Sequence, residues 1–396
     1  MSDFALRPLS AIATIITGST PSSGQTDSWG DECDFITPSD QSDSLREATP
    51  ARRLSATGIS RLKSRVVPAR STNLTCIGST IGKVSMTRSA AITNQQINSI
   101  IARESISDAG FIYYMIKNWS GSLKDHASGS ATPIINKSVL ARFHFLVPPI
   151  GDQRAIAEVL GALDDKIAAN TLMAKNSIQL LQSIHEHLRL RQREVRKAPL
   201  GSLATTVLGG TPSRDNAEFW INGSVAWINS GKANETIITQ PSEWITESAL
   251  EKSATKLMPR GTTVVAITGA TLGQIARLEI SACGNQSLVG IWSGNPDLND
   301  WLYLEVNSRM PELLTKATGA AQQHVNKKDV DSLLVEVADE RTLGAFGDRA
   351  RPLLDLCVVK ELESGSLAKL RDLILPQLMS GKLRVKEAEV LVEGLV

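Results

Sequence analysis

The chain has 396 residues, which is long enough for two or three domains with sizeable cores. Its formal net charge is only +1, so no global field points to nucleic acid or to a membrane surface as a partner. The four scattered cysteines form no CxxC pair, which is typical of reduced thiols. Neither a signal peptide nor a run of 18 apolar residues occurs, so we expect a soluble cytoplasmic protein.

Residues 1–150 are expected to form a first globular domain of mixed helix and strand. Short apolar runs, such as 34–37 and 99–102, alternate with stretches rich in Gly, Pro, Ser and Asn. These runs are typical of strands joined by polar loops, and 109–118 has the pattern of a helix between them. A second domain of the same texture is predicted at 199–338.

Each domain is followed by a predicted long helix, at residues 151–198 and at 339–383. In both segments apolar residues recur three or four positions apart, which is the spacing of a helix face that packs on another helix. Prolines bound the first segment and Gly381 ends the second. Residues 384–396 would form a C-terminal tail. The residues expected at the helix-pair interface are Ile156, Leu163, Ile167, Leu181, Leu188, Leu354, Leu362, Leu370 and Leu378.

The second domain repeats the first in a nearly constant register. The repeated elements, each 191 positions apart, are a Thr-Pro segment (18–21 and 209–212), a glycine pair (78–82 and 269–273) and Asn-Gln (94–95 and 285–286). A single period this long indicates two copies of a domain plus its helix. The predicted fold class is therefore α+β, with two duplicated mixed α/β domains. The two helices would pack as an antiparallel coiled coil with pseudo-twofold symmetry.

No arrangement of side chains in the sequence indicates catalysis. His185 and His187 are two positions apart on the predicted helix and point to different faces, so they cannot chelate one metal. Gly78 and Gly82 have part of the spacing of a phosphate-binding loop, but no Gly-Lys-Ser/Thr completes it. We therefore expect a chain that is not an enzyme and holds no metal or cofactor of its own.

The remaining signals concern binding, and they differ between the two domains. Residues 46–70 of the first domain carry seven Arg and Lys residues against Glu47 alone, which would suit contacts to phosphate. Over residues 1–150 there are 15 basic and 11 acidic residues, whereas 199–338 has 10 basic and 14 acidic. The second domain would therefore depend on side-chain readout or on basic partners.

Several of these motifs together resemble one protein family. PPIGDQRAI at 148–156, followed by LDDKI at 163–167, resembles the spacer helix of specificity subunits of type I restriction–modification enzymes, and LPQLMSGKL at 375–383 is similar to the end of the second helix. The Thr-Pro starts near Trp29 and Trp220 are similar to the openings of that family's target-recognition domains. The chain departs from the pattern at 337–341, where the prolines and the Gln are lost.

The resemblance implies a DNA-reading scaffold within a larger enzyme. Each target-recognition domain would bind one half of a bipartite asymmetric site in double-stranded DNA, and the helices would set the unread spacer. Two modification (methyltransferase) subunits would dock on the chain and bring S-adenosylmethionine, and restriction subunits would bring ATP and Mg. The alternative that the residues leave open is a protein-interaction scaffold with two similar domains on a helical strut.

Residues that could contact DNA are sought among polar and basic side chains in the loops, where such contacts are made. For each of them, a turn residue satisfied by its own backbone is an equally good interpretation. Thr20-Pro21 and Thr211-Pro212 are interpreted as structural turns. The predicted DNA-binding residues are Arg61, Lys63, Ser79, Thr80, Lys83, Arg88, Gln95 and Gln96 in the first copy, and Thr271, Gln274, Gln286, Gln322 and Gln323 in the second.

Overall fold

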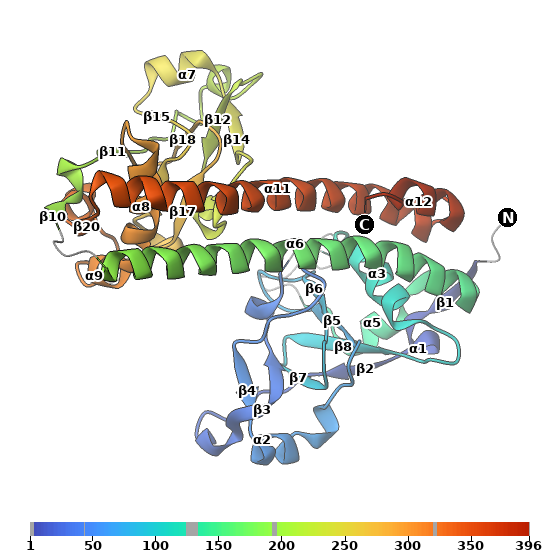
Figure 1. The fold of residues 1–396 in the computed structure, drawn as a ribbon. Coiled ribbons are helices and arrows are strands. Elements are labelled where there is room, and N and C mark those ends of the chain that lie inside the picture. Colours follow the sequence, from blue (N-terminus) through green and yellow to red (C-terminus); the bar gives the residue numbers. More distant parts are fainter. Residues whose placement is uncertain (1–3, 43, 124–133, 192–195, 320–322, 396) are drawn as a thin grey trace. The chain divides into compact units, whose positions relative to one another are not determined.

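The computed structural model describes residues 4–42, 44–123, 134–191, 196–319 and 323–395. The chain divides into two compact units, each containing one predicted domain and half of each long helix. The first unit combines Met1–Ala169 with Ser364–Val396, and the second is Asn170–Glu363. The long helices α6 (Ile150–Leu190) and α11 (Glu340–Met379) therefore contribute to both units (Figure 1). No helix within the described ranges combines the length and the apolar character needed to cross a bilayer.

The first unit is built on two small sheets and a strand pair. One sheet has the order β2-β8-β5-β6 and the other the order β4-β3-β7, in which β3 and β7 are parallel. Strand β1 pairs with β9, so the start and the end of the domain lie together next to α6. The strands are β1 (Ala5–Pro8), β2 (Ala13–Thr17), β3 (Trp29–Ile36), β4 (Arg52–Leu54), β5 (Thr72–Thr75), β6 (Val84–Met86), β7 (Ala91–Thr93), β8 (Ile97–Ala102) and β9 (His144–Val147). The helices are α1 (Leu9–Ile12), α2 (Ala56–Arg61), α3 (Ala109–Ser120), α5 (Lys137–Arg142) and α12 (Val385–Val392).

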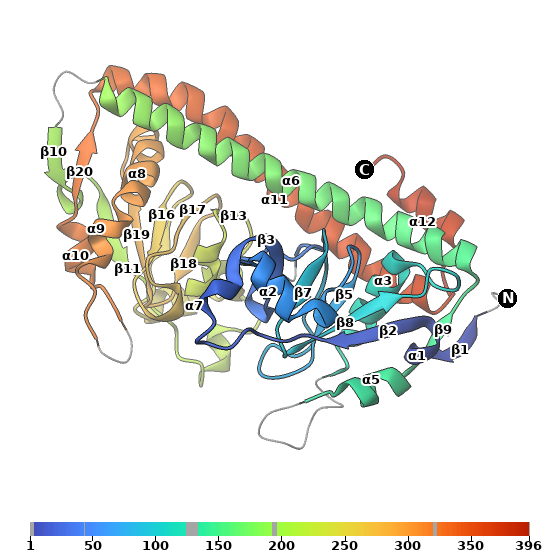
Figure 2. The same ribbon diagram turned by 90° about the horizontal axis from the view of Figure 1, so that it is seen from below.

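The second unit repeats this plan with one further strand at the edge of each sheet. Figure 2 shows the strands β16, β17 and β13 of its larger sheet. Its sheets have the orders β11-β19-β16-β17-β13 and β14-β12-β18-β15, with β10 paired to β20. The strands are β10 (Arg196–Pro199), β11 (Thr205–Leu208), β12 (Val225–Ile228), β13 (Ile237–Ile238), β14 (Glu243–Ile245), β15 (Leu257–Met258), β16 (Thr263–Ala266), β17 (Ile275–Leu278), β18 (Ala282–Gly284), β19 (Leu288–Trp292) and β20 (Leu334–Val337). The helices are α7 (Glu247–Lys252), α8 (Pro296–Ser308), α9 (Met310–Leu314) and α10 (Lys327–Asp331). The predicted α+β class with two duplicated domains is confirmed.

The two long helices pack against each other within each unit. In the first unit, residues of α6 and of the end of α11 share one apolar core with α3, the shared residues including Ile156, Leu163, Leu375 and Leu378. In the second unit, Leu181 of α6 and Leu354 of α11 belong to another core, and Cys357 Sγ lies 3.5 Å from the carbonyl oxygen of Ala174. In each unit, the segments of α6 and α11 thus bury their apolar residues against the domain as well as against each other.

Most of the residues predicted for the helix-pair interface lie in these two cores. Ile156, Leu163, Ile167, Leu181, Leu354 and Leu378 are buried, and Leu188 and Leu370 are partly buried against the same cores. Leu362 differs, because its side chain is 44 % exposed and so lies outside the buried stripe. The predicted C-terminal tail contains α12, which buries Ala388 and Val392 in the core of the first unit.

The two long helices begin in different ways. In α6, the buried Gln153 side chain donates to the carbonyl oxygens of Pro148 and Ile106 and accepts from the backbone N–H of Asp108. It therefore ties the start of α6 to the start of α3. At α11, where this Gln is absent from the sequence, Asp339 Oδ1 accepts from the backbone N–H of Thr342 at 2.7 Å. A carboxylate cap satisfies the first turn there.

A buried ion pair links both helices to the domain in the first unit. Arg371 of α11 donates to Asp164 of α6 at 2.6 Å, and both side chains are at most 3 % exposed. Tyr114 of α3 donates its hydroxyl to the other carboxylate oxygen of Asp164, also at 2.6 Å. Three elements therefore meet at a single carboxylate.

Asp164→Asn should destabilise the first unit by about 3 kcal/mol, because it leaves the buried Arg371 with Asp372 as its remaining ion-pair partner. The neighbouring Asp165→Asn is the matched control, since Asp165 is 67 % exposed and its pair with Arg46 should contribute less than about 1 kcal/mol. Urea unfolding of the two variants measures the difference. Equal effects of the two substitutions would contradict this assignment.

The second unit has its own charged tie, around Glu336 of β20. Arg189 of α6, Arg309 between α8 and α9, and Lys197 of β10 contact its carboxylate at 2.8, 2.9 and 3.1 Å. Burial opposes ionisation of this carboxyl, but hydrogen bonds from Arg189 and Lys197 outweigh burial and lower its pKa from 4.5 to about 2. The negative charge of Glu336 is therefore stabilised in the folded state.

This lowered pKa predicts a pH-dependent contribution to stability. Glu336 should stabilise the fold by about 3 kcal/mol above pH 5, and the contribution should disappear as the pH falls toward 2. The free energy of unfolding of wild type minus Glu336→Gln, measured across that range, should therefore shrink with falling pH. A difference that stays constant would show that the carboxylate is not the group responsible.

Candidate nucleic-acid interface

In the first unit, three loops come together at one end of the β2-β8-β5-β6 sheet. They are the segment after β2 (18–21), the β5–β6 connection (76–83) and the β7–β8 connection (94–96). The backbone N–H of Ser19 donates to Thr93 O at 2.8 Å, and that of Cys76 donates to Gln96 O at 2.8 Å. The backbone itself therefore joins the three loops into one surface, which we call the loop face.

Glycines make this close assembly possible. A Cβ at Gly18 would lie 2.1 Å from Asn94 O, so no larger residue could approach the β7–β8 connection in this way. Gly78 and Gly82 have φ values of 89° and 91°, a left-handed conformation that favours glycine. The repeated glycines seen in the sequence are therefore explained by the backbone of the loop face.

The second unit builds the same loop face from the repeated residues. A Cβ at Gly209 would lie 2.1 Å from Asn285 O, and the N–H of Ile267 donates to Ser287 O at 2.9 Å. Gly269 and Gly273 again have positive φ, at 69° and 83°. The segment before α10 adds to this face, because Gly269 N–H donates to Gln323 O at 3.3 Å.

One side-chain contact recurs in both faces and joins two of the sequence motifs. Thr20 Oγ1 donates to Gln95 Oε1 at 2.6 Å, and Thr211 Oγ1 donates to Gln286 Oε1 at 2.5 Å. All four side chains lie at the surface, whereas the prolines that follow the threonines are buried. The Thr-Pro segments were interpreted as turns only. That interpretation missed the threonine hydroxyls, although the constant spacing between Thr-Pro and Asn-Gln in the two copies could have indicated the pair.

The loop faces contain many of the predicted DNA-binding residues. In the first unit, Ser79 and Gln95 are exposed, and Thr80 and Gln96 are half-buried. In the second, Gln286 and Gln323 are exposed and Thr271 and Gln274 are half-buried. The Oε1 atom of Gln274 is buried without a hydrogen-bond partner among the described residues. Gln322 lies outside the residues that the structure describes.

Lys83 lies at the first loop face, but its ammonium group is hydrogen-bonded to backbone carbonyl groups of the same unit. Its Nζ donates to Gln41 O at 3.2 Å and to Pro38 O at 3.5 Å, and the residue is half-buried. The buried Gln41 in turn donates to Asn73 O and Ser85 Oγ under the loops. Lys83 therefore links the β5–β6 connection to the backbone of Pro38 and Gln41. This role was not foreseen from the sequence.

The other basic residues predicted to bind DNA are not gathered at the loop face. Arg61 forms an ion pair with Asp27 at 2.6 Å, and Lys63 is an exposed residue two positions after the end of α2. Arg88 pairs with Glu47 at 2.9 Å and lies in the β6–β7 turn. Because the loop face lies where β6 begins, that turn lies at the opposite end of the strand. From the same basic run, Arg65 approaches the loop face, donating to Thr17 O at 3.1 Å.

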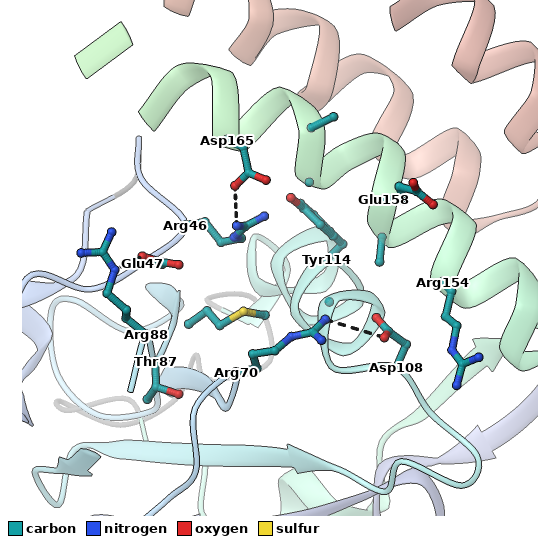
Figure 3. Close-up of a pocket in the computed structure, with 15 residues that line it drawn as sticks. Arg46, Glu47, Arg70, Thr87, Arg88, Asp108, Tyr114, Arg154, Glu158 and Asp165 are labelled. Atoms are coloured by element: carbon teal, nitrogen blue, oxygen red, sulfur yellow. Dashed lines mark hydrogen bonds and ion pairs between the residues drawn. The ribbon is translucent and has the colours of Figure 1, made fainter. Parts of the chain in front are cut away.

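A separate cavity of about 500 Å³ lies beside this far end of β6, between the first domain and α6 (Figure 3). Basic and acidic side chains both line this cavity and form ion pairs there. Arg46 is 2.6 Å from Asp165, and Arg70 is 3.7 Å from Asp108. Arg70 has a positive φ of 62°, where the second copy has Gly261. The cavity is thus distinct from the loop face and its charges are largely paired internally.

Nothing in the described part of the chain has the arrangement of a metal centre, since no cluster of three or more His, Cys, Asp and Glu side chains occurs there. The four cysteines are buried, free thiols, and burial raises the pKa of Cys76 and Cys357 to about 11. Each unit thus presents hydrogen-bond donors and acceptors on exposed loops at one end of a sheet.

Comparison with known proteins agrees with this geometry. The family model described as type I restriction modification DNA specificity domain matches residues 1–180 and 193–338. The chain is 22 % identical to the type I restriction enzyme MjaIX specificity subunit of Methanocaldococcus jannaschii, over 97 % of this chain and 94 % of that protein. It is 27 % identical to the EcoR124I/EcoR124II specificity subunit of Escherichia coli, over 46 % of each.

A solved structure shares the fold. The type I restriction–modification S subunit from M. genitalium superposes with a TM-score of 0.56 at 14 % identity, covering 95 % of this chain and 96 % of that one. The family model spans most of the chain and matches it in two stretches, one for each copy of the repeat. The resemblance noted in the sequence is confirmed, and the chain belongs to the type I restriction–modification DNA specificity family.

Proposed function

We propose that the chain reads a bipartite DNA site through its two loop faces, each face binding one half. The observation that carries the proposal is that the same loops are assembled twice, on the same backbone hydrogen bonds, but present different side chains. Ser79 and Gln96 of the first copy stand where the second has Ala270 and Ser287. Two faces with one backbone plan and different chemistry suit two different half-sequences, so the whole site would be asymmetric.

The long helices have two roles in this proposal. They join the two loop faces through continuous helical segments and thereby set the length of the unread spacer. They also dock the partner subunits, two for modification and others for restriction. Exposed apolar side chains on the helices of the second unit, where a partner could bury them, support docking; they are Leu172, Met173, Leu180, Val359 and Leu362. S-adenosylmethionine, ATP and Mg would be bound by those partners, and this chain would be non-catalytic.

The decisive experiment is the methylome of cells with and without this gene. Loss of methylation at one bipartite motif upon deletion is the expected result, and complementation by the intact gene should restore it. An unchanged methylome would contradict the proposal and favour the alternative of a protein-interaction scaffold.

Exchange of one domain should change one half of the site. Replacing residues 20–147 by the matching domain of a relative should alter only the half-sequence read by the first unit, because each unit has its own sheets and core. Sequencing of the methylated motif in cells carrying the chimaera measures this outcome. Alteration of both half-sequences would show that the units do not read independently.

Lengthening both helices should lengthen the spacer. Four residues inserted after Ala169 and four after Glu363, at the boundaries of the units, leave the packing inside each unit intact. At about 1.5 Å per residue the helices grow by roughly 6 Å, which corresponds to one or two base pairs at about 3.4 Å each. The methylated motif should keep both half-sequences and gain that spacing.

The control insertion uses two residues at each position instead of four. It turns the helix by about 200°, whereas four residues turn it by about 400° and almost restore the phase. The variant with two-residue insertions should lose methylation because the helix faces no longer match. A variant with four-residue insertions that methylates the original spacing would show that the helices do not set the distance.

A further inference from the structure

The two Thr–Gln pairs of the loop faces have a property that base-reading residues should not have: they are the same in both copies. We propose that Thr20–Gln95 and Thr211–Gln286 grip the DNA phosphate backbone, one grip in each half-site, and do not select the base sequence. This inference rests on the proposed function. It assigns to Gln95 and Gln286 a positioning role in place of the base-reading role predicted from the sequence.

The internal duplication supplies the first argument. If the two faces read different half-sequences, the side chains that choose bases must differ between the copies, and the parts that hold any DNA can stay the same. The Thr–Gln pairs, with the same spacing of 75 residues and hydrogen bonds of 2.6 and 2.5 Å, belong to the constant part. Contacts to phosphate fix register and orientation but carry no sequence information.

The hydrogen-bonding state of the amide supplies the second argument. The threonine hydroxyl takes one of the two lone pairs of Oε1 of each Gln, and it leaves the NH₂ group, which donates two hydrogen bonds, fully available to a ligand. Neither Nε2 has a hydrogen-bond partner among the described residues. Reading adenine would in addition need the remaining lone pair of Oε1 to accept from the base, beside the threonine hydroxyl. A phosphate oxygen only accepts, so the NH₂ group alone suffices to bind it.

The loop backbone holds the grip in place. Asn94 Oδ1 accepts from the N–H of Gln96 at 3.1 Å, and Asn285 Oδ1 accepts from the N–H of Ser287 at 3.2 Å. Each Gln thus occupies the middle of a turn closed by an Asn side chain. With the threonine fixing the side chain and the asparagine fixing the backbone, the NH₂ group is oriented before DNA arrives, which reduces the entropy lost on binding.

A neutral grip also explains how an acidic domain could hold DNA. Residues 199–338 carry more acidic than basic residues, so a phosphate contact there cannot depend on a surplus of Arg and Lys. An amide donor makes the contact without a charge. Both units then hold the backbone in the same way despite their different charge balance.

The test replaces each Gln by Glu in the full-length chain, as Gln95→Glu and Gln286→Glu. The new carboxylate still accepts the threonine hydrogen bond, so the loop keeps its conformation and the melting temperature should not change. The NH₂ donor is replaced by a negative charge facing phosphate. Affinity for a DNA duplex of randomised sequence, measured with the chain alone and with its modification subunits, should fall roughly tenfold or more.

The control is Gln179→Glu, which makes the same charge change on an exposed position of α6 and should leave DNA affinity unaltered. In cells, Gln95→Glu should lower the extent of methylation while both half-sequences stay the same. A changed half-sequence would overturn the proposal, because it would show that Gln95 reads bases. Wild-type affinity in both variants would overturn it as well, leaving a turn-forming role only.

The outcomes separate this inference from the proposed function. Wild-type protein that binds no DNA, alone or with its partners, would overturn both. Wild-type binding combined with unaffected Gln→Glu variants would overturn the grip alone. Thr20→Val provides an independent check, because it removes the hydroxyl at nearly constant volume and frees the amide to rotate. It should weaken binding to all sequences alike, and a sequence-selective loss would contradict the grip.

Discussion

The buried carboxylate of Asp164 is the interaction on which the first unit depends. It is held by Arg371 of one long helix and by Tyr114 of the domain, while its own backbone belongs to the other long helix. In the second unit, Glu336 has the corresponding role and is held by Arg189 of α6 and by Arg309, which directly follows α8. Leaving a buried charge unpaired costs several kcal/mol, so each of these ion pairs favours the one arrangement of helices and domain in which its partners meet. The loop faces are therefore carried on sheets whose attachment to the helices is strongly specified.

The two units share the backbone arrangement of their sheets and loops, but the side chains buried beneath the loops differ. Under the first loop face the sheet buries polar side chains, among them Asn73 and Ser99, which are hydrogen-bonded to each other at 2.8 Å. The second copy has Val264 and Gly290 at those positions. Backbone hydrogen bonds of the strands and the glycines of the loops are common to both, so they define the fold. The side chains beneath the loops differ between the copies, and the polar ones of the first copy are partly satisfied by one another, as Ser99 Oγ is by Asn73 Oδ1.

Much of the architecture was predictable from the sequence, because helical spacing over forty residues and a repeat in constant register are strong signals. Gly18 and Gly209 marked the loops, but only the structure shows why a Cβ is excluded there. The candidate site was harder to predict. Charge alone does not reveal that Arg61 is paired with Asp27 or that Lys83 is bonded to the backbone beneath its own loop. Such partners are far apart in sequence, and only the fold brings them together.

The nesting of the chain has a consequence for its synthesis. The second unit is one continuous stretch, Asn170–Glu363, whereas the first unit needs Ser364–Val396 to complete its core. On the ribosome the second unit can therefore finish folding first, while Ile156 and Leu163 in the helix of the first unit lack part of their apolar cover until Leu375 and Leu378 emerge. Exposed apolar surface of this kind favours aggregation and recognition by chaperones. A nascent chain that ends before its last segment would thus keep apolar surface exposed on the first unit, where chaperones and proteases can recognise it.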